Sequence, residues 1–397
     1  MSKESGRTDE AAIIFALIVG NFVVGFSVLL VPGMLSTLAL GMGVSIPVAG
    51  QLITVASIVM GVGAPLGAAF TSRFDRRYLL TAMMVLFLVG HLACAFAPNY
   101  LTLMLARAVT VIGAALFTPQ AAATVALLVP PQRRASSVAA IFIGWSVASV
   151  AAMPSINLIA TQFGWRAPFF VASSCALVAA ILVWRVVPVG LRVPPLALRS
   201  WLVVAKHPLL LSVLAITLIS MAAQFTVFSY MVPIMDKALG ASAAMIAIAF
   251  LAYGVTGVLG NTLTVRLLPR VGAEHLMLAF ILMLIVSLGM WGIALQMSSG
   301  AMALIIAAML LWGFCGFASN STQQGRLLVA APELASATIA LNTSFLYVGQ
   351  AIGTLIGAWL IAHGGYSALP WVGACLMFGA LAMSFIAART VRRTKGL

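Results

Sequence analysis

Residues 12–36 read AIIFALIVGNFVVGFSVLLVPGMLS, and none of these 25 side chains is charged. An α-helix needs about 20 mostly apolar residues to cross the hydrocarbon core of a bilayer. The run is continuously apolar, whereas the strands of membrane β-barrels alternate between apolar and polar residues with a period of two. The stretch therefore predicts a membrane-spanning helix.

Further runs of this kind follow along the whole chain. Of its 397 residues, 63% are hydrophobic and 7% are charged, whereas soluble domains carry about 25% charged residues. Most of the protein surface must therefore face lipid. The predicted spans are 12–36, 47–70, 78–98, 101–129, 137–161, 166–188, 209–235, 241–266, 275–297, 300–325, 335–362 and 367–388. The sequence thus predicts an all-α membrane protein with twelve transmembrane helices.

The positive charges are unevenly placed between these spans. The chain carries 21 Lys and Arg residues and a net charge of +14. With the loops assigned alternately to the two sides, 18 of the 21 lie on the side of the termini. Arg166 and Lys237 lie on the other side, and Arg107 lies inside a span. Cytoplasmic loops are enriched in Lys and Arg. The asymmetry predicts a bacterial inner-membrane protein with both termini in the cytoplasm, and it accounts for the basic charge without a nucleic-acid partner.

An internal repeat divides the chain near its midpoint. Leu127-Leu128-Val129 followed by Ala135-Ser136 recurs 200 residues later as Leu327-Leu328-Val329 followed by Ala335-Ser336. The spacing of Gly67, Arg73 and Arg77 recurs as Gly260, Arg266 and Arg270. Parallel six-helix halves around a central site are typical of one large class of transporters. We therefore predict two pseudo-symmetric bundles, at 1–188 and 209–397, joined by a cytoplasmic linker at 189–208.

The usual signs of an enzyme or a cofactor site are missing from the sequence. The four cysteines, Cys94, Cys175, Cys315 and Cys375, lie singly in different spans, without metal-ligand or disulfide spacing. The chain has no phosphate-binding loop of the Gly-x4-Gly-Lys kind and no HExxH motif. We therefore expect neither enzymatic activity nor a bound cofactor or metal. A non-transporting membrane receptor remains an alternative to a transporter.

Three stretches carry recognisable motifs. Between the second and third spans the chain reads Gly67-Ala-Ala-Phe-Thr71-Ser-Arg73-Phe-Asp75-Arg76-Arg77. The fourth span contains Ala106, Arg107 and Gly113, and the fifth runs from Gly144 through Pro154 to Gly164-Trp165-Arg166. These stretches resemble the major facilitator superfamily, in particular its bacterial drug–proton antiporter and arabinose-efflux-permease-like branch. The resemblance covers nearly the whole chain. Thr71 stands where the loop usually has its first acidic residue, and Ala152 and Ile156 stand where the antiporter motif usually has glycines.

The resemblance implies a monomeric transporter in which two halves rock about a central site, lined by the first, fourth, seventh and tenth spans. The implied substrate-binding or coupling candidates are Asn21, Arg107, Thr110, Gln224, Phe228, Trp312, Asn320, Thr343, Tyr347 and Gln350. The signature loop supplies the gating candidates Gly67, Arg73, Asp75, Arg76 and Arg77. For each polar residue, a hydrogen bond between helices is an equally open alternative. Gly349, Gly353 and Gly357 form a stripe that predicts a helix-packing surface.

Charges inside a membrane are costly and mark functional candidates. Arg107 either contacts the substrate or modulates proton binding, or it is a structural residue held by carbonyls and by hydroxyls such as that of Thr110. No Asp or Glu lies in a span core. Because lipophilic cations generally need a buried carboxylate, a neutral or anionic small molecule is favoured. Asp236 and His91 are the candidates for proton coupling, although His91 is also suited to packing against a neighbouring helix.

The function predicted from these observations is secondary active transport of a small organic molecule by alternating access. Efflux of a sugar or an antibiotic, coupled to protons, is the first expectation. Uptake or facilitated transport of an organic anion or metabolite is the alternative.

Overall fold

The computed structural model describes residues 2–71, 73–130, 133–192, 203–204, 206–331 and 334–394. Within these residues every regular element is helical. The first half contains α1 (Ser2–Gly33), α2 (Leu35–Met42), α3 (Ile46–Phe70), α4 (Arg76–Ala95), α5 (Tyr100–Leu128), α6 (Arg134–Ile141), α7 (Ile143–Phe163) and α8 (Ala167–Val186). The second contains α10 (Pro208–Phe228), α11 (Met231–Pro233), η2 (Ile234–Ala238), α12 (Ala243–Val271), α13 (Ala273–Ala294), α14 (Ala301–Ala330), α15 (Ala335–Gly364) and α16 (Ala368–Thr394). Twelve segments of this described part are long and apolar enough to cross a membrane, which confirms the predicted fold class.

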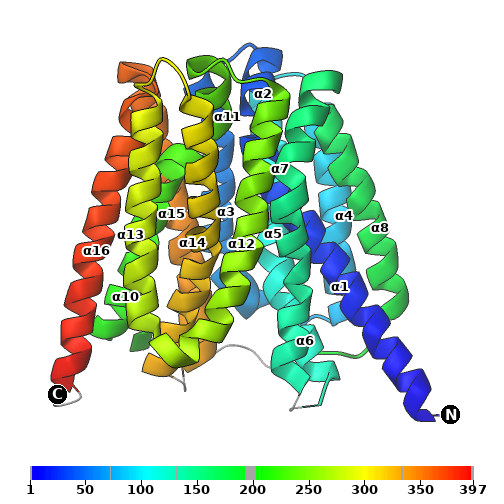
Figure 1. Ribbon diagram of the computed structural model, residues 1–397. Helices are drawn as coiled ribbons and strands as arrows, with labels where there is room; N and C mark the ends of the chain where they lie inside the picture. The colour runs from blue at the N-terminus through cyan, green and yellow to red at the C-terminus, as the bar shows by residue number, and fades with distance from the viewer. Residues whose placement is uncertain are drawn as a thin grey trace.

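The two termini lie at the same end of the bundle (Figure 1). We call this end, which also carries Arg77 and Arg185, the basic end, and we call the opposite end, with α2 and α11, the far end. Contact between the halves runs mainly along two helix pairs, because α3 packs against α15 and α7 packs against α12. The remaining long helices pack mostly within their own half. This is the paired arrangement expected of two pseudo-symmetric bundles.

The buried apolar side chains show where the halves are joined. The largest core cluster includes residues from both halves at the far end, among them Met34 and Leu38 with Tyr230 and Met231. Two smaller clusters have all their buried residues in one half each. Val125 and its neighbours belong to the first half, and Leu327 and its neighbours belong to the second. The halves are therefore joined through the largest cluster at the far end, and in the second half this cluster continues along α13 to Leu276 near the basic end.

The predicted span limits differ from the observed ones by a few residues, and the main differences are helix breaks. The first span was predicted to continue to residue 36, but α1 ends at Gly33 and α2 begins at Leu35. The seventh span is interrupted after Phe228. There Ser229 Oγ lies 2.7 Å from Thr354 Oγ1, and the Tyr230 hydroxyl donates to the Thr354 carbonyl oxygen at 2.8 Å. These side-chain bonds fasten the interrupted segment to α15.

The glycine stripe of α15 packs on the backbone of α10. A Cβ added at Gly349, Gly353 or Gly357 would approach the carbonyl oxygens of Leu218, Ala222 and Thr226 respectively, too closely to fit. Those carbonyls recur every four residues on α10, as the glycines do on α15. This confirms the predicted packing surface, since small residues let two membrane helices approach closely.

The repeated glycines before the basic motifs have matching roles. Gly67 of α3 lies against Leu116 of α5, and Gly260 of α12 lies against the backbone of Phe314 on α14. In both halves a glycine near the basic end therefore allows close approach to the helix after next. The domain limits at 188 and 209 stay a prediction, and most of the linker between them lies outside the described residues.

Candidate functional site

A buried cluster in the first half joins α1, α4 and α5 around Arg107. The guanidinium Nη1 donates to Ser27 Oγ at 3.1 Å, and Nη2 donates to the Ser27 carbonyl oxygen at 2.6 Å. Arg107 is 2% exposed. None of the three ion pairs found among the described residues includes it. A buried cation is therefore held by one hydroxyl and one carbonyl of the same residue.

His91 of α4 shares the same serine. Its Nδ1 lies 2.7 Å from the Phe87 carbonyl oxygen, and its Nε2 lies 3.0 Å from Ser27 Oγ. A carbonyl oxygen can only accept, so Nδ1 carries a proton and Nε2 accepts the Ser27 hydroxyl proton. The ring stacks on Phe87, with centroids 5.4 Å apart, and also faces Phe169 of α8. His91 thus packs between helices, as one of the two alternatives had it, and its part in proton coupling stays a prediction.

Thr110 lies beside this cluster, one turn after Arg107 on α5. Its hydroxyl donates to the Ala106 carbonyl oxygen at 2.6 Å. Gly90 of α4 makes room for it, because a Cβ there would overlap the Thr110 side chain. The hydroxyl that holds Arg107 therefore belongs to Ser27, which was not among the predicted residues, and not to Thr110.

Asn21 of α1 forms a second link between α1 and α5. The Thr118 hydroxyl donates to Asn21 Oδ1 at 2.7 Å. Asn21 is fully buried and its Nδ2 has no hydrogen-bond partner. An unpaired amide donor in a buried position is costly, so this group is well placed to receive an acceptor atom from a ligand.

In the second half, three predicted residues meet between α10 and α14. Trp312 Nε1 donates to Gln224 Oε1 at 2.9 Å, and Gln224 Nε2 donates to the Ser220 carbonyl oxygen at 3.2 Å. The ring of Phe228 lies 6.4 Å from that of Trp312 and 5.5 Å from that of Tyr253 on α12. The result is an aromatic group with one fixed amide, which suits a ligand with an apolar face and a few polar atoms.

Asn320 belongs to a buried polar network that links α10, α14 and α15. Asn342 Nδ2 donates to Asn320 Oδ1 at 3.2 Å, and Thr217 Oγ1 donates to Asn342 Oδ1 at 2.7 Å. Gln323 Nε2 in turn donates to Thr217 Oγ1 at 3.3 Å. Because every link joins two different helices, the network fixes the position of Asn320.

The same network reaches the basic end through Arg326. Arg326 Nη1 donates to Gln323 Oε1 at 2.8 Å. Its Nε and Nη2 bind both carboxylate oxygens of Glu274, at 2.9 and 2.7 Å. This bidentate pair fastens α14 to the start of α13.

The three predicted residues of α15 lie near the crossing with α3. The Thr343 hydroxyl donates to the Ile339 carbonyl oxygen at 3.0 Å on its own helix. Tyr347 packs against the core of the first half, and a Cβ at Gly61 of α3 would lie 3.5 Å from its Cβ. Gln350 is buried on the same helix. Tyr347 is thus a residue of the contact between the halves.

The signature loop holds the start of the linker. Asp75 Oδ1 accepts from the Arg77 amide at 2.9 Å, which caps α4. Its Oδ2 accepts from the Gly190 amide, and the Arg76 amide donates to the Leu191 carbonyl oxygen at 3.0 Å. Both oxygens of this carboxylate are therefore engaged by residues that belong to the loop and the linker.

The three arginines of the loop have different surroundings. Arg76 is fully buried, and its Nη1 donates to Gln120 Oε1 on α5. The Arg77 guanidinium lies over the Trp184 ring of α8, 4.6 Å from its centroid. Arg73 is exposed. The loop is thus anchored to α5 and α8 within the first half, and its gating role stays a prediction.

Asp236, the other predicted proton-coupling residue, lies at the far end in η2. Its carboxylate is 3.6 Å from Lys237 Nζ, and its side chain is 37% exposed. Asp236 and the Arg107 cluster lie in different halves of the chain, and no described hydrogen bond or ion pair joins them.

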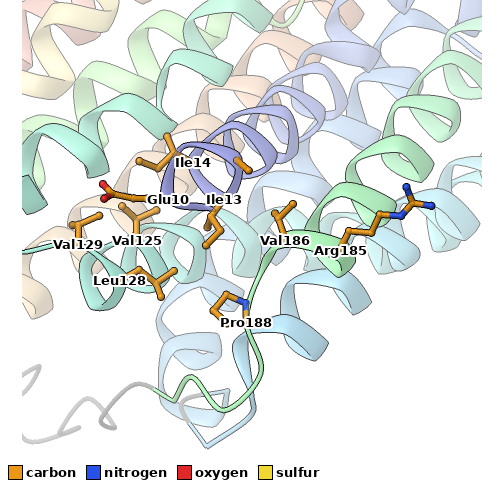
Figure 2. A pocket seen from close by; sticks show the side chains of 10 residues that line it. Glu10, Ile13, Ile14, Val125, Leu128, Val129, Arg185, Val186 and Pro188 are labelled. Carbon is orange, nitrogen blue, oxygen red and sulfur yellow. The ribbon is translucent and has the colours of Figure 1, made fainter. Parts of the chain in front are cut away.

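A cavity of about 470 Å³ opens near the basic end between α1, α5 and α8. Figure 2 shows its lining, which is mostly apolar and includes Ile13, Val125, Leu128 and Val186. The Arg185 guanidinium extends away from the apolar side chains, whereas the Glu10 carboxylate lies on the side of Val125 and Val129 (Figure 2). It does not contain any of the predicted site residues.

Comparison with known proteins shows the family of this chain. Residues 17–343 match the family model described as Major Facilitator Superfamily. The chain belongs to the Major Facilitator Superfamily. Because this family consists of transporters, the protein is a transporter and not an enzyme.

Curated relatives match over nearly their whole length. The chain is 29% identical to the inner membrane transport protein YdhP of Escherichia coli (strain K12), covering 95% of this chain and 96% of that one. It is 30% identical to a chloramphenicol resistance protein of Streptomyces lividans, covering 94% and 95%. It is 28% identical to a probable sugar efflux transporter of Mannheimia succiniciproducens, covering 82% and 81%. Of these relatives, one is named as a probable sugar efflux transporter and one for chloramphenicol resistance.

Among solved structures, a D-xylose-proton symporter superposes with a TM-score of 0.72 at 19% identity, covering 94% of this chain and 96% of that one. At this identity the likeness shows the Major Facilitator Superfamily fold alone.

Proposed function

We propose that this protein exports a small neutral or anionic organic molecule across the bacterial inner membrane, by alternating access and with coupling to protons. The observation that carries the proposal is the buried Arg107, which no described acidic residue neutralises. A cationic substrate would meet this charge without a compensating carboxylate in any span core. Relatives named for chloramphenicol resistance and sugar efflux support the same choice of substrate.

Alternating access is supported by the way the halves touch. A Cβ at Gly254 of α12 would collide with the backbone of Ser149 and Val150 on α7. On the other side, a Cβ at Gly61 of α3 would lie 3.3 Å from the Ser344 carbonyl oxygen of α15. Each contact pair between the halves thus has a glycine at its crossing. Together with the shared core at the far end, these two crossings suit a rocking motion that opens the basic end.

The topology follows from the charge asymmetry of the loops. In our proposal the basic end is cytoplasmic, so both termini and the linker lie inside the cell. The structure is then a state closed toward the outside. The transporting unit is one chain with bundles at 1–188 and 209–397.

A thermal-shift panel on the detergent-purified protein tests the substrate class. We expect chloramphenicol, neutral sugars or organic anions to raise the melting temperature at about pH 6 and pH 8, and tetraphenylphosphonium to leave it unchanged. We expect Arg107→Ala to remove the ligand-induced shift, because the positive charge that favours such ligands is gone.

The matched control is Arg166→Ala. Arg166 also donates to backbone carbonyls, those of Ala95 and Ala97, but it makes no bond to Ser27 or His91. It should keep the ligand-induced shift even where the unliganded protein melts earlier. Stabilisation by the lipophilic cation would contradict the proposal, and stabilisation by an organic anion alone would restrict the proposed substrate to the anionic class.

A further inference from the structure

His91 and Arg107 are two basic side chains that share a single hydroxyl. Ser27 Oγ lies 3.0 Å from His91 Nε2 and 3.1 Å from Arg107 Nη1. Both side chains are buried, His91 with no exposed surface. The bonds run in one direction, from the Arg107 guanidinium to the Ser27 oxygen and from the Ser27 hydroxyl to His91 Nε2.

This direction depends on His91 carrying a proton on Nδ1 alone. Adding a proton to Nε2 would turn an acceptor into a donor, and the Ser27 hydroxyl would lose its acceptor there. It would also place a second positive charge two hydrogen bonds from the guanidinium. Two like charges at such a separation repel strongly where water is excluded.

The Phe87 carbonyl oxygen accepts from His91 Nδ1, but no described hydrogen bond or ion pair joins His91 to a carboxylate that would offset a second charge. The α1 helix contributes Ser27, and α8 contributes the ring of Phe169. The titratable groups nearby are the Arg107 guanidinium of α5 and the thiol of Cys94 on α4, the helix of His91 itself. No described ion pair includes either His91 or Arg107.

Arg107 is held loosely for a buried cation. It has two bonds, both to Ser27, and its buried Nε has no hydrogen-bond partner. A buried arginine without a carboxylate is poorly compensated. It can therefore leave Ser27 for a better acceptor at lower cost than an arginine in an ion pair.

The geometry points to His91 as a proton-binding site. While Arg107 is bound to Ser27, it prevents a second proton from binding to His91, and His91 takes up that proton when Arg107 leaves Ser27. The inference rests on the proposed function, because proton-coupled transport requires a proton-binding site and His91 would be that site. A departing Arg107 also breaks its two bonds to Ser27 on α1, while the bond between Thr118 and Asn21 still joins α5 to α1. Proton uptake is thereby linked to a looser contact between α5 and α1.

The first test observes the imidazole ring directly in the full chain. Nitrogen-15 NMR of histidine-labelled protein in lipid nanodiscs separates neutral rings from imidazolium, and His91→Gln identifies the signal among the four histidines. We expect His91 to stay neutral with Nδ1 protonated between about pH 5 and pH 8 in the wild type. In Arg107→Gln it should become imidazolium within that range.

If Arg107→Gln fails to fold, Arg107→Met serves as a second variant. Unchanged signals of His207, His275 and His363 report that each variant is folded. An imidazolium at His91 with Arg107 in place would overturn the inference. So would a ring that stays neutral in a folded variant, since burial alone would then exclude the proton.

The second test separates this inference from the proposed function. In proteoliposomes with chloramphenicol as the probe, His91→Gln should keep exchange at equal concentrations and lose accumulation driven by a pH gradient. Gradient-driven accumulation that persists in His91→Gln would overturn the role of His91. A wild type that moves no chloramphenicol, sugar or organic anion in either mode would instead refute the proposed function, whatever the NMR result.

Discussion

Replacing Gly353 by alanine is expected to prevent stable folding of the second half. The added methyl group would overlap the carbonyl oxygen of Ala222, and its nearest neighbours are all backbone atoms of α10. A side chain can rotate away, whereas a helix backbone must move as a whole, and α15 is fixed to α10 at two more glycines. We expect a loss of about 3 kcal/mol or more, measured by SDS-induced unfolding and by the yield of monodisperse protein.

Gly289→Ala is the matched control in the same half. Gly289 lies within α13, and no atom lies within 4 Å of the position its Cβ would take. Alanine favours a helix over glycine by about 1 kcal/mol, so this variant should be as stable as the wild type or slightly more stable. Equal stability of Gly353→Ala and Gly289→Ala would show that α10 and α15 are not packed as closely as described.

Glu274→Ala is expected to destabilise the protein strongly, because it leaves Arg326 as a buried cation without its carboxylate. The Arg326 side chain is 2% exposed, and Glu274 at 36% is its partner in a bidentate pair. Breaking a fully buried pair costs about 3–5 kcal/mol, and the exposure of Glu274 lowers our expectation to about 2–3 kcal/mol. Thermal unfolding in detergent and SDS titration both measure the loss.

The double variant Glu274→Ala with Arg326→Leu should recover part of that loss, since it removes the uncompensated charge. Asp236→Ala is the exposed control, because its pair with Lys237 lies at the surface and should contribute less than about 1 kcal/mol. If Glu274→Ala and Asp236→Ala cost the same, the pair at the basic end is not buried in the folded protein.

The fold was largely predictable because the bilayer imposes it. Twelve apolar runs, the offset of 200 residues between Leu127 and Leu327, and the stripe at Gly349, Gly353 and Gly357 each have one physical meaning in a membrane. Helix breaks were less predictable. At the interruption, the side chains of Ser229 and Tyr230 bond to Thr354, which is far away in the sequence.

Some residues of the site could be predicted from the sequence, but their hydrogen-bond partners could not. Gln224, Phe228 and Trp312 were predicted because they lie on helices expected to line the central site, and the structure brings these three side chains together. Ser27, Thr217, Asn342 and Gln323 were missed because short polar residues are common in membrane helices and their partners come from other helices. The spacing of Asn320, Gln323 and Arg326, three residues apart on one helix face, is a signal that could have found part of the network.

Proton-driven transport of a neutral or anionic compound is tested most directly with the purified protein in sealed liposomes. With an inward-directed or outward-directed pH gradient, we expect accumulation of chloramphenicol, a neutral sugar or a small organic anion, with no accumulation of tetraphenylphosphonium. The accumulation should collapse when a protonophore removes the gradient. Failure of every neutral and anionic compound to move, or gradient-driven accumulation of the cation in their place, would refute the proposed transport.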